Sequence, residues 1–185
     1  LDGKVGKQGR IFGKTKYKNK DIYNKPICKL IEEFLISSHT LYVLDLFCGY
    51  GSYLNSISKQ FNSQCIGIDI DEFSTWKEYS SDNVCFFQKD VFDVINNVKC
   101  VKPFDIIITT NTLRSLDKGE LEKHNYVFRD LSGVNVVKDC VDFSPFLEWC
   151  NINSKYLITR GGEDGQLKGF EKVSREGSIN LFKSV

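Results

Sequence analysis

One stretch, residues 41–54, constrains this chain more than any other. It reads Leu-Tyr-Val-Leu-Asp-Leu-Phe-Cys-Gly-Tyr-Gly-Ser-Tyr-Leu: an apolar run reaches Asp45, two glycines follow, and apolar residues then recur at helical spacing. A buried strand that ends in a glycine turn and a helix typically brings the chain to a ligand at the carboxyl edge of a parallel sheet. We therefore expect the fold to be organised around this strand.

Composition indicates one globular domain. The 185 residues are 41% hydrophobic and 26% charged, and no apolar run approaches the roughly 20 residues that a membrane helix needs. The N-terminus is basic and lacks the apolar core of a secretory signal. Seven scattered cysteines include no Cys-x-x-Cys pair, so we interpret them as reduced, mostly buried thiols of a cytoplasmic protein and expect no metal site.

Strand and helix patterns alternate along the chain after residue 25. The spacing predicts helices from Pro26 to residue 35 and over 71–79, 118–127 and 144–150, and a terminal hairpin that pairs 169–174 with 178–185. We predict an α/β fold: a doubly wound, mostly parallel seven-stranded sheet that ends in an antiparallel hairpin, with helices on both faces. The expected parallel strands are residues 42–46, 64–69, 83–89, 104–110 and 155–159.

Charge is unevenly distributed, although the net charge is only +1. Residues 1–29 hold nine lysines and arginines against two aspartates, a charge of +7, so the remainder carries −6. We therefore divide the chain into a basic, partly flexible N-terminal arm (1–24) and a single domain (25–185). The arm suits a phosphate backbone, with Lys and aromatic residues interleaved as nucleic-acid binding favours. It could equally be a solvated tail or close over a ligand pocket.

The glycine turn resembles a known family. Asp45-Leu-Phe47-Cys-Gly49-Tyr-Gly51 is similar to the Asp/Glu-x-Gly-x-Gly-x-Gly turn of class I S-adenosylmethionine-dependent methyltransferases, with Phe47 in place of the first glycine. The variant with Phe at that place is frequent among nucleic-acid methyltransferases. The resemblance covers residues 25–185 and implies S-adenosyl-L-methionine as the cofactor.

The resemblance assigns the turn to cofactor binding. Independently of it, Gly49 and Gly51 permit positive φ and close backbone approach to a ligand, and the free N–H groups of the following helix suit a carboxylate. The family pattern places Asp45 near the amino end of the cofactor, through water, and includes Phe47 in the binding turn.

The later strand ends supply the remaining cofactor residues. Asp69, 24 residues after Asp45, matches the acid that takes both ribose hydroxyls, as a carboxylate with two acceptor oxygens can. Ile70, or its neighbour Asp71, would flank the adenine. Asp90 matches the acid that receives the adenine amino group, with the Val91 backbone reading the ring edge. The alternative is that these acids are N-caps of the helices that follow the strands.

Catalytic residues are weakly marked. The predicted fourth strand ends Thr-Thr-Asn111-Thr, which matches neither the Asp/Asn-Pro-Pro-Tyr/Phe of amino-methylating enzymes nor the Pro-Cys of cytosine C5 enzymes. Asn111 is our candidate catalytic residue, because its amide could orient a target amine or hydroxyl; the alternative is a structural turn residue. We interpret Cys48 as a packing thiol and His39 as an exposed loop residue.

These observations predict an S-adenosylmethionine-dependent methyltransferase (EC 2.1.1 class) that acts on nucleic acid, with RNA favoured over DNA and bound through the basic arm. We expect no membrane association and allow for a partner protein subunit. Two other classes stay open. One is a catalytically silent subunit of this fold that binds a partner or nucleic acid, and the other is a methyltransferase for protein or a small molecule.

Overall fold

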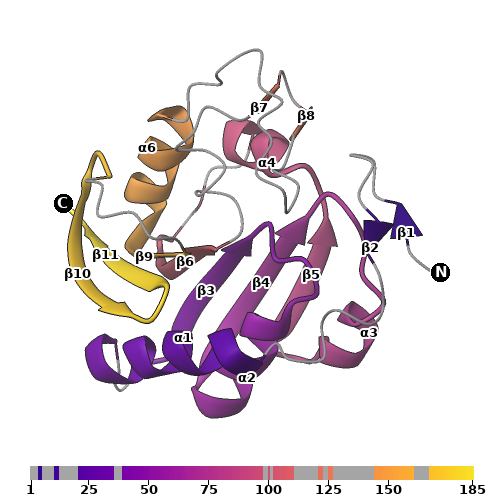
Figure 1. Cartoon of the computed structure of the whole chain (residues 1–185), viewed down its shortest axis with the longest axis horizontal. Coiled ribbons are helices and arrows are strands. Elements are labelled where there is room, and N and C mark those ends of the chain that lie inside the picture. Colours follow the sequence, from indigo (N-terminus) through magenta and orange to yellow (C-terminus); the bar gives the residue numbers. More distant parts are fainter. Residues whose placement is uncertain are drawn as a thin grey trace.

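The computed structural model describes residues 21–35, 39–97, 100, 102–110, 144–160 and 167–185, together with four two-residue strands. Its centre is a seven-stranded sheet in the order β10-β11-β9-β6-β3-β4-β5 (Figure 1). Within the described residues, no helix is long and apolar enough to span a membrane.

All strands of the sheet are parallel except the terminal hairpin. The parallel strands are β3 (Leu41–Leu46), β4 (Ser63–Asp69), β5 (Val84–Gln88), β6 (Phe104–Thr109) and β9 (Ser154–Arg160). The hairpin strands β10 (Phe170–Glu176) and β11 (Ile179–Ser184) pair antiparallel, and β11 closes onto β9. This is the predicted fold class, including the terminal hairpin.

Helices cover both faces of the sheet (Figure 1). On one face, α1 (Asp21–Phe34) and α2 (Ser52–Gln60) pack Ile27 and Leu54 into a buried cluster with Val43 of β3. On the other, α4 (Val91–Asn97) and α6 (Ser144–Asn153) pack Val91 and Phe146 against Leu44. Neighbouring residues of β3 thus serve opposite faces, as the pleat of a strand requires.

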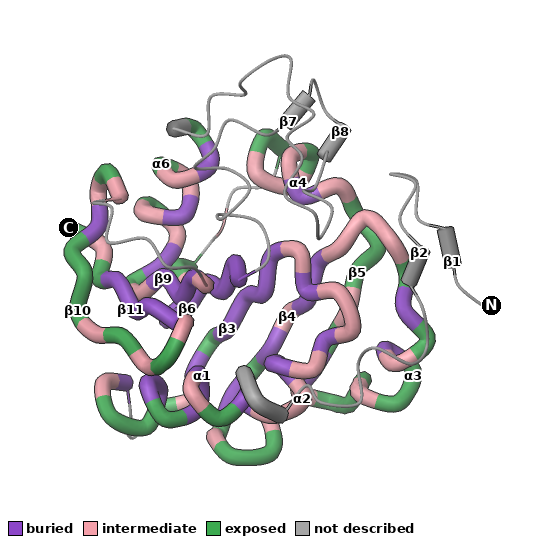
Figure 2. The backbone as a smooth tube through the Cα atoms, viewed as in Figure 1, coloured by how far each residue is buried: buried purple, intermediate pink, exposed green. Residues whose placement is uncertain are grey.

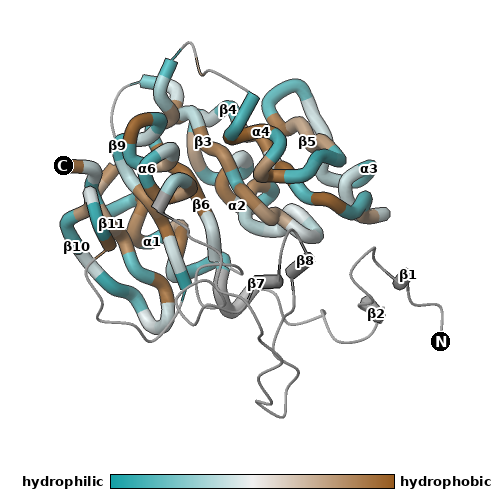
Figure 3. The backbone as a smooth tube through the Cα atoms, turned by 90° about the horizontal axis from the view of Figure 1, so that it is seen from above, coloured by the Kyte–Doolittle hydropathy of each residue, from teal (hydrophilic) through white to brown (hydrophobic). Residues whose placement is uncertain are grey.

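The central strands are buried and the edge strands are exposed (Figure 2). Ile106, Ile107 and Ile108 of β6 are each fully buried, which confirms the expectation of a strand covered on both faces. Hydrophobic residues gather along β3 and β6, whereas the edge strand β10 is mainly hydrophilic (Figure 3). Charged residues on β10 protect that edge from pairing with another chain.

Three predicted helices differ from the structure. α1 begins at Asp21, so Pro26 lies inside this helix instead of at its start. The helix expected over 71–79 is reduced to α3 (Trp76–Tyr79). The helix expected over 118–127 is wrong where the backbone is described, because β7 (Leu121–Glu122) and β8 (Asn125–Tyr126) pair as an antiparallel ladder. The short apolar pattern there was too weak to distinguish the two periodicities.

A second short ladder lies in the N-terminal arm, where β1 (Lys4–Val5) pairs antiparallel with β2 (Ile11–Phe12). The sequence did not predict it, because two-residue strands carry no detectable alternation.

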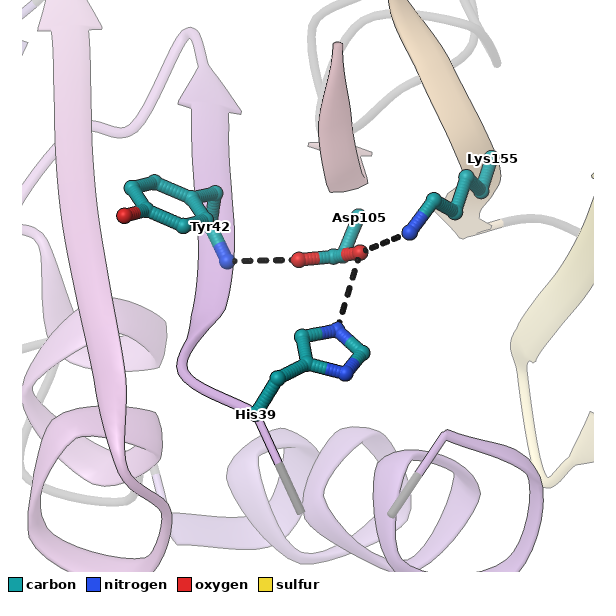
Figure 4. Close-up of polar contacts among 4 residues, drawn as sticks. All are labelled: His39, Tyr42, Asp105 and Lys155. Atoms are coloured by element: carbon teal, nitrogen blue, oxygen red, sulfur yellow. Dashed lines mark hydrogen bonds and ion pairs between the residues drawn. The ribbon is translucent and has the colours of Figure 1, made fainter. Parts of the chain in front are cut away.

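A polar cluster joins the amino ends of the parallel strands (Figure 4). The side chain of Asp105, near the start of β6, accepts hydrogen bonds from the Tyr42 backbone N–H of β3 at 2.9 Å and from Lys155 Nζ of β9 at 2.6 Å. His39 Nε2 lies 3.3 Å from the same carboxylate. Because the three strands are adjacent, one buried acid ties them together at the edge opposite their carboxyl ends.

Candidate functional site

The candidate site lies where β3 ends. The strand order reverses there, since β3 pairs with β4 on one side and with β6 on the other. In open α/β sheets, ligands bind at the carboxyl ends of strands at such a switch point. The residues that follow β3 form the predicted glycine turn and lead directly into α2.

The turn contains three residues in the left-handed region of φ: Phe47 (63°), Gly49 (52°) and Gly51 (73°). For a bulky residue such as Phe47 this conformation is strained. Its ring packs in an aromatic cluster with Phe92 of α4 and Phe146 of α6, at centroid distances of 6.3 and 6.2 Å. This packing offsets the strain, which explains how a phenylalanine occupies a place where the related turns have glycine.

The two glycines have different surroundings. A Cβ added at Gly49 would meet nothing within 4 Å, whereas one at Gly51 would lie 2.4 Å from Cε1 of Phe86. Close approach of a ligand to the backbone is therefore possible at Gly49. At Gly51 the positive φ agrees with the prediction, and a side chain there would meet the ring of Phe86.

Asp45 is buried, and the described residues do not satisfy all of its hydrogen-bonding capacity. Its side chain is almost completely inaccessible, and its Oδ2 has no hydrogen-bond partner among the described residues. Burial, and secondarily the nearby carboxylate of Asp69, raise the pKa of Asp45 well above its usual value. A buried acceptor without a donor is costly, so this position favours a ligand that brings a donor or a positive charge.

Asp69 is held rigidly at the end of β4. Its Oδ2 accepts the Gly49 N–H at 2.9 Å, and its Oδ1 accepts the Asp71 N–H at 3.1 Å. Each carboxylate oxygen can accept more than one hydrogen bond, and the two backbone bonds orient the group. The residue predicted to bind the ribose is therefore hydrogen-bonded directly to the glycine turn.

Asp90 follows β5 at the same edge of the sheet. Its Oδ1 accepts the Phe92 N–H at 2.9 Å, which makes it the N-cap of α4, as the alternative interpretation holds. Val91 is buried beneath it, and the Ile70 carbonyl accepts a hydrogen bond from Gln88 Nε2 at 3.1 Å. The structure thus brings Asp45, Gly49 and Asp69 together, and it places Asp90 one strand further along.

The predicted catalytic position stays a prediction. Asn111 lies outside the described residues. Before it, Thr109 at the end of β6 and the following Thr110 have buried hydroxyls without a hydrogen-bond partner among the described residues. Cys48 is buried, and burial followed by the charges of Asp45 and Asp69 raises the pKa of its thiol well above the usual value. A protonated, buried thiol suits packing and not nucleophilic attack.

Sequence reasoning did not assign a role to the residues behind the turn. Trp76 of α3 donates its indole N–H to the Gly49 carbonyl at 2.7 Å, and Thr75 donates its hydroxyl to the Tyr50 carbonyl at 2.8 Å. The indole stacks on the ring of Phe86, with centroids 5.2 Å apart and planes 10° apart. Trp76 was visible in the sequence only as an apolar residue of a short helix.

Comparisons with known proteins support the fold assignment. The sequence matches no protein-family model and no curated protein. Three of the solved structures that match this chain compare with it as follows. yhhF from Escherichia coli, to which methyltransferase activity is ascribed, has a TM-score of 0.57 at 9% identity over 95% of this chain and 92% of its own. N-methyltransferase NodS from Bradyrhizobium japonicum WM9, in complex with S-adenosyl-L-homocysteine, has 0.55 at 9% over 89% and 86%. A Klebsiella pneumoniae protein with an ascribed O-methyltransferase activity has 0.53 at 8% over 90% and 80%.

At such identities the likeness concerns the fold alone. The chain has the Rossmann-like fold of class I methyltransferases, with a seven-stranded mixed sheet, an antiparallel terminal hairpin and flanking helices.

Proposed function

We propose that this chain is an S-adenosylmethionine-dependent methyltransferase that modifies nucleic acid, with RNA as the favoured acceptor. The observation that carries the proposal is the buried, unpartnered carboxylate oxygen of Asp45 at the switch point of the sheet, on the strand that leads into the turn with the open face of Gly49. The proteins that share the fold include one whose structure holds S-adenosyl-L-homocysteine.

The residues of the turn fit the methionyl end of such a cofactor. Asp45 would accept a hydrogen bond from the ammonium group, directly or through water, and the positive charge would offset the repulsion between Asp45 and Asp69. The N–H groups in the first turn of α2 suit the carboxylate.

The strand ends fit the adenosine end. Asp69 would accept hydrogen bonds from the ribose hydroxyls, and its bonds to the Gly49 and Asp71 N–H groups hold it in place before a ligand arrives. Asp90, with one oxygen committed to the cap of α4, would receive the adenine amino group on the other. Val91 and Ile70 would contact the ring.

When bound, this cofactor supplies an electrophilic methyl group on a sulfonium. The chain itself has to hold the acceptor atom in line with that group and keep water away, and positioning of this kind accounts for much of the rate in bimolecular reactions. Asn111 is the residue that we propose for orienting the acceptor.

The nucleic-acid acceptor rests on two sequence features. Phe47 gives the turn the form that is frequent in nucleic-acid methyltransferases, and the N-terminal 29 residues carry a charge of +7. Residues that bind phosphate groups are predominantly Lys and Arg, and nine of the first 29 residues are of these two types.

Calorimetry tests the cofactor assignment. It measures the binding of S-adenosyl-L-methionine and S-adenosyl-L-homocysteine to the full chain. Asp69→Ala should weaken binding at least about tenfold, because hydrogen bonds to a charged acceptor are lost. Asp82→Ala removes an exposed carboxylate from the loop after α3 and is the matched control. If the intact protein binds neither compound, the proposal is rejected.

Transfer of a labelled methyl group tests the acceptor. Total RNA, DNA, protein and small-molecule fractions are offered separately to the full chain, and RNA should be labelled. If only protein or only small molecules are labelled, the proposal of an RNA acceptor is wrong, but the proposal of a methyltransferase stands. Cofactor binding without transfer to any fraction would favour a catalytically silent subunit, which the absence of a recognised acceptor motif after β6 also suggests.

A further inference from the structure

The turn after β3 is held from behind by α3. The carbonyls of two consecutive residues, Gly49 and Tyr50, accept hydrogen bonds from the side chains of Trp76 and Thr75, at 2.7 and 2.8 Å. Both donors belong to the segment that follows Asp69, and Asp69 accepts the Gly49 N–H. A single stretch of chain, from the end of β4 to α3, therefore contacts the turn at three points.

These bonds determine which way the turn presents its amides. In a trans peptide the C=O of one residue and the N–H of the next point in opposite directions. With the Gly49 carbonyl directed at Trp76, the Tyr50 N–H is directed away from α3. With the Tyr50 carbonyl directed at Thr75, the Gly51 N–H is directed away as well, and it donates to the Cys48 carbonyl at 3.0 Å.

The indole of Trp76 is fixed by its own packing. Its side chain is buried, and its ring stacks on Phe86 while it also contacts Phe73 at a centroid distance of 5.8 Å. Phe86 in turn fills the space beside Gly51 and Gly67, where an added Cβ would come within 2.4 and 2.5 Å of its ring. The donor is thus locked by aromatic packing before any ligand binds, as preorganisation requires.

We propose that Trp76, assisted by Thr75, is a positioning residue for the cofactor. It holds the Gly49 and Tyr50 carbonyls toward α3 and thereby keeps the open face of Gly49 directed at the ligand. This inference rests on the proposed function, because it assigns the ligand side of the turn to S-adenosylmethionine. It also links the two ends of the cofactor, since the same segment carries Asp69.

Two substitutions isolate the hydrogen bonds from the packing. Trp76→Phe keeps an aromatic ring against Phe86 but removes the donor, and Thr75→Val removes the hydroxyl at nearly constant shape. Trp149→Phe makes the same chemical change at the other tryptophan of the chain, on α6 and on the opposite face of the sheet. It is the matched control for stability.

Trp76→Phe should weaken binding of S-adenosyl-L-homocysteine about tenfold, because an acceptor loses its buried donor and the turn loses its orientation. Thr75→Val should change affinity in the same direction, while Trp149→Phe should leave affinity unchanged. Equal affinity of Trp76→Phe and the wild type would overturn the inference while leaving the proposed function intact.

A second readout does not depend on the ligand. In the ligand-free protein, the indole N–H of Trp76 should be protected from hydrogen exchange, and Trp76→Phe should accelerate exchange of the Gly49 and Gly51 amides. Unchanged exchange would overturn the positioning role by itself. If the wild type binds no cofactor but Trp76→Phe accelerates amide exchange, the proposed function is rejected. Trp76 would then order the turn without a role in cofactor binding.

Discussion

Asp45 is the residue at which stability and binding oppose each other most directly. It is buried, one of its oxygens has no partner among the described residues, and its pKa is raised by burial and by Asp69. Asp45→Asn removes the ionisable group and keeps the shape. We expect its melting temperature near neutral pH to rise by about 2–4 °C, the shift that corresponds to about 1 kcal/mol in a domain of this size.

The same substitution should weaken S-adenosyl-L-homocysteine binding, because an amide offers no charge to the ammonium group. Differential scanning fluorimetry and calorimetry on the same preparations measure the two effects. A variant that is both less stable and equally able to bind the ligand would contradict this assignment of Asp45.

The raised pKa of Asp45 also gives a pH dependence with a definite sign. Its protonated form is the one that the folded state favours, so the stabilising contribution is complete below the unfolded-state pKa of about 3.9 and is lost as pH rises through the raised value. The stability advantage of Asp45→Asn over the wild type should therefore grow with rising pH. Melting temperatures of both proteins across a pH series measure it, and a constant difference would argue against a titrating Asp45.

Gly67 and Phe86 should be energetically coupled. A Cβ at Gly67 would lie 2.5 Å from the ring of Phe86 and 2.9 Å from Cys48 Sγ, although the backbone of β4 is ordinary there. Gly67→Ala should cost about 1–3 kcal/mol of unfolding free energy through overpacking. Phe86→Leu should reduce that cost, so that the double variant is more stable than the sum of the single changes predicts. Urea unfolding measures the three stabilities. If the effects of the two single substitutions add up in the double variant, the Phe86 ring moves aside without strain and the two positions are not coupled.

At the scale of elements, the strands at the centre of the sheet are tied together at their amino ends by Asp105. Burial raises the pKa of this carboxyl, but hydrogen bonds from Lys155, the Tyr42 backbone and His39 outweigh it, so the pKa is lowered overall. Asp105→Asn loses the charge-assisted bond to Lys155 and should cost about 2 kcal/mol near neutral pH.

A lowered folded-state pKa means that the contribution of Asp105 is present above the unfolded-state value of about 3.9 and is lost as pH falls through the folded-state value. The difference between the variant and the wild type should accordingly shrink in acid. Urea unfolding at neutral and acidic pH measures this, with Asp82→Asn as the exposed control. A difference that is independent of pH would mean that the lost contacts are not ionic.

Elements with an unambiguous apolar pattern could be predicted from the sequence. The run from Val43 to Leu46 and the three isoleucines of β6 are buried on both faces. A near-continuous apolar run of this length predicts a strand at the centre of a parallel sheet. Prediction failed for residues 121–126, where a few apolar residues fit either period, and for the start of α1, where Pro26 suggested a boundary that lies at Asp21.

The candidate site was partly predictable for the same reason. Asp45 is the next-to-last residue of β3 and Asp69 is the last residue of β4, so their place near the carboxyl edge follows from the topology. The contacts of Trp76 with Gly49, and of Phe86 with Gly51, join residues more than 25 positions apart in the chain. No local pattern encodes such pairings, because they depend on how β5 and α3 pack behind the turn.

At the scale of the whole molecule, the chain separates its charges: residues 1–29 carry +7 and the remainder −6. If the arm binds RNA, deletion of residues 1–20 should weaken RNA binding and lower its dependence on salt concentration, because each lost phosphate contact removes about 0.7 from the logarithmic slope for single strands. Binding of S-adenosyl-L-homocysteine should be unchanged, since Asp45, Asp69 and the turn lie outside the deleted segment.

Replacing Lys14, Lys16, Lys18 and Lys20 by glutamine separates charge from chain length. This variant should lower the salt slope in the same direction as the deletion but by less, because it removes four of the seven lysines and arginines of residues 1–20 and keeps every residue position. An arm that acts as a lid gives the opposite pattern, in which the deletion weakens cofactor binding while the glutamine variant and the salt slope of RNA binding stay as in the wild type. Filter binding across a salt series, combined with calorimetry for the cofactor, distinguishes the two, because phosphate contacts depend on charge whereas closure over a pocket depends on the presence of the segment.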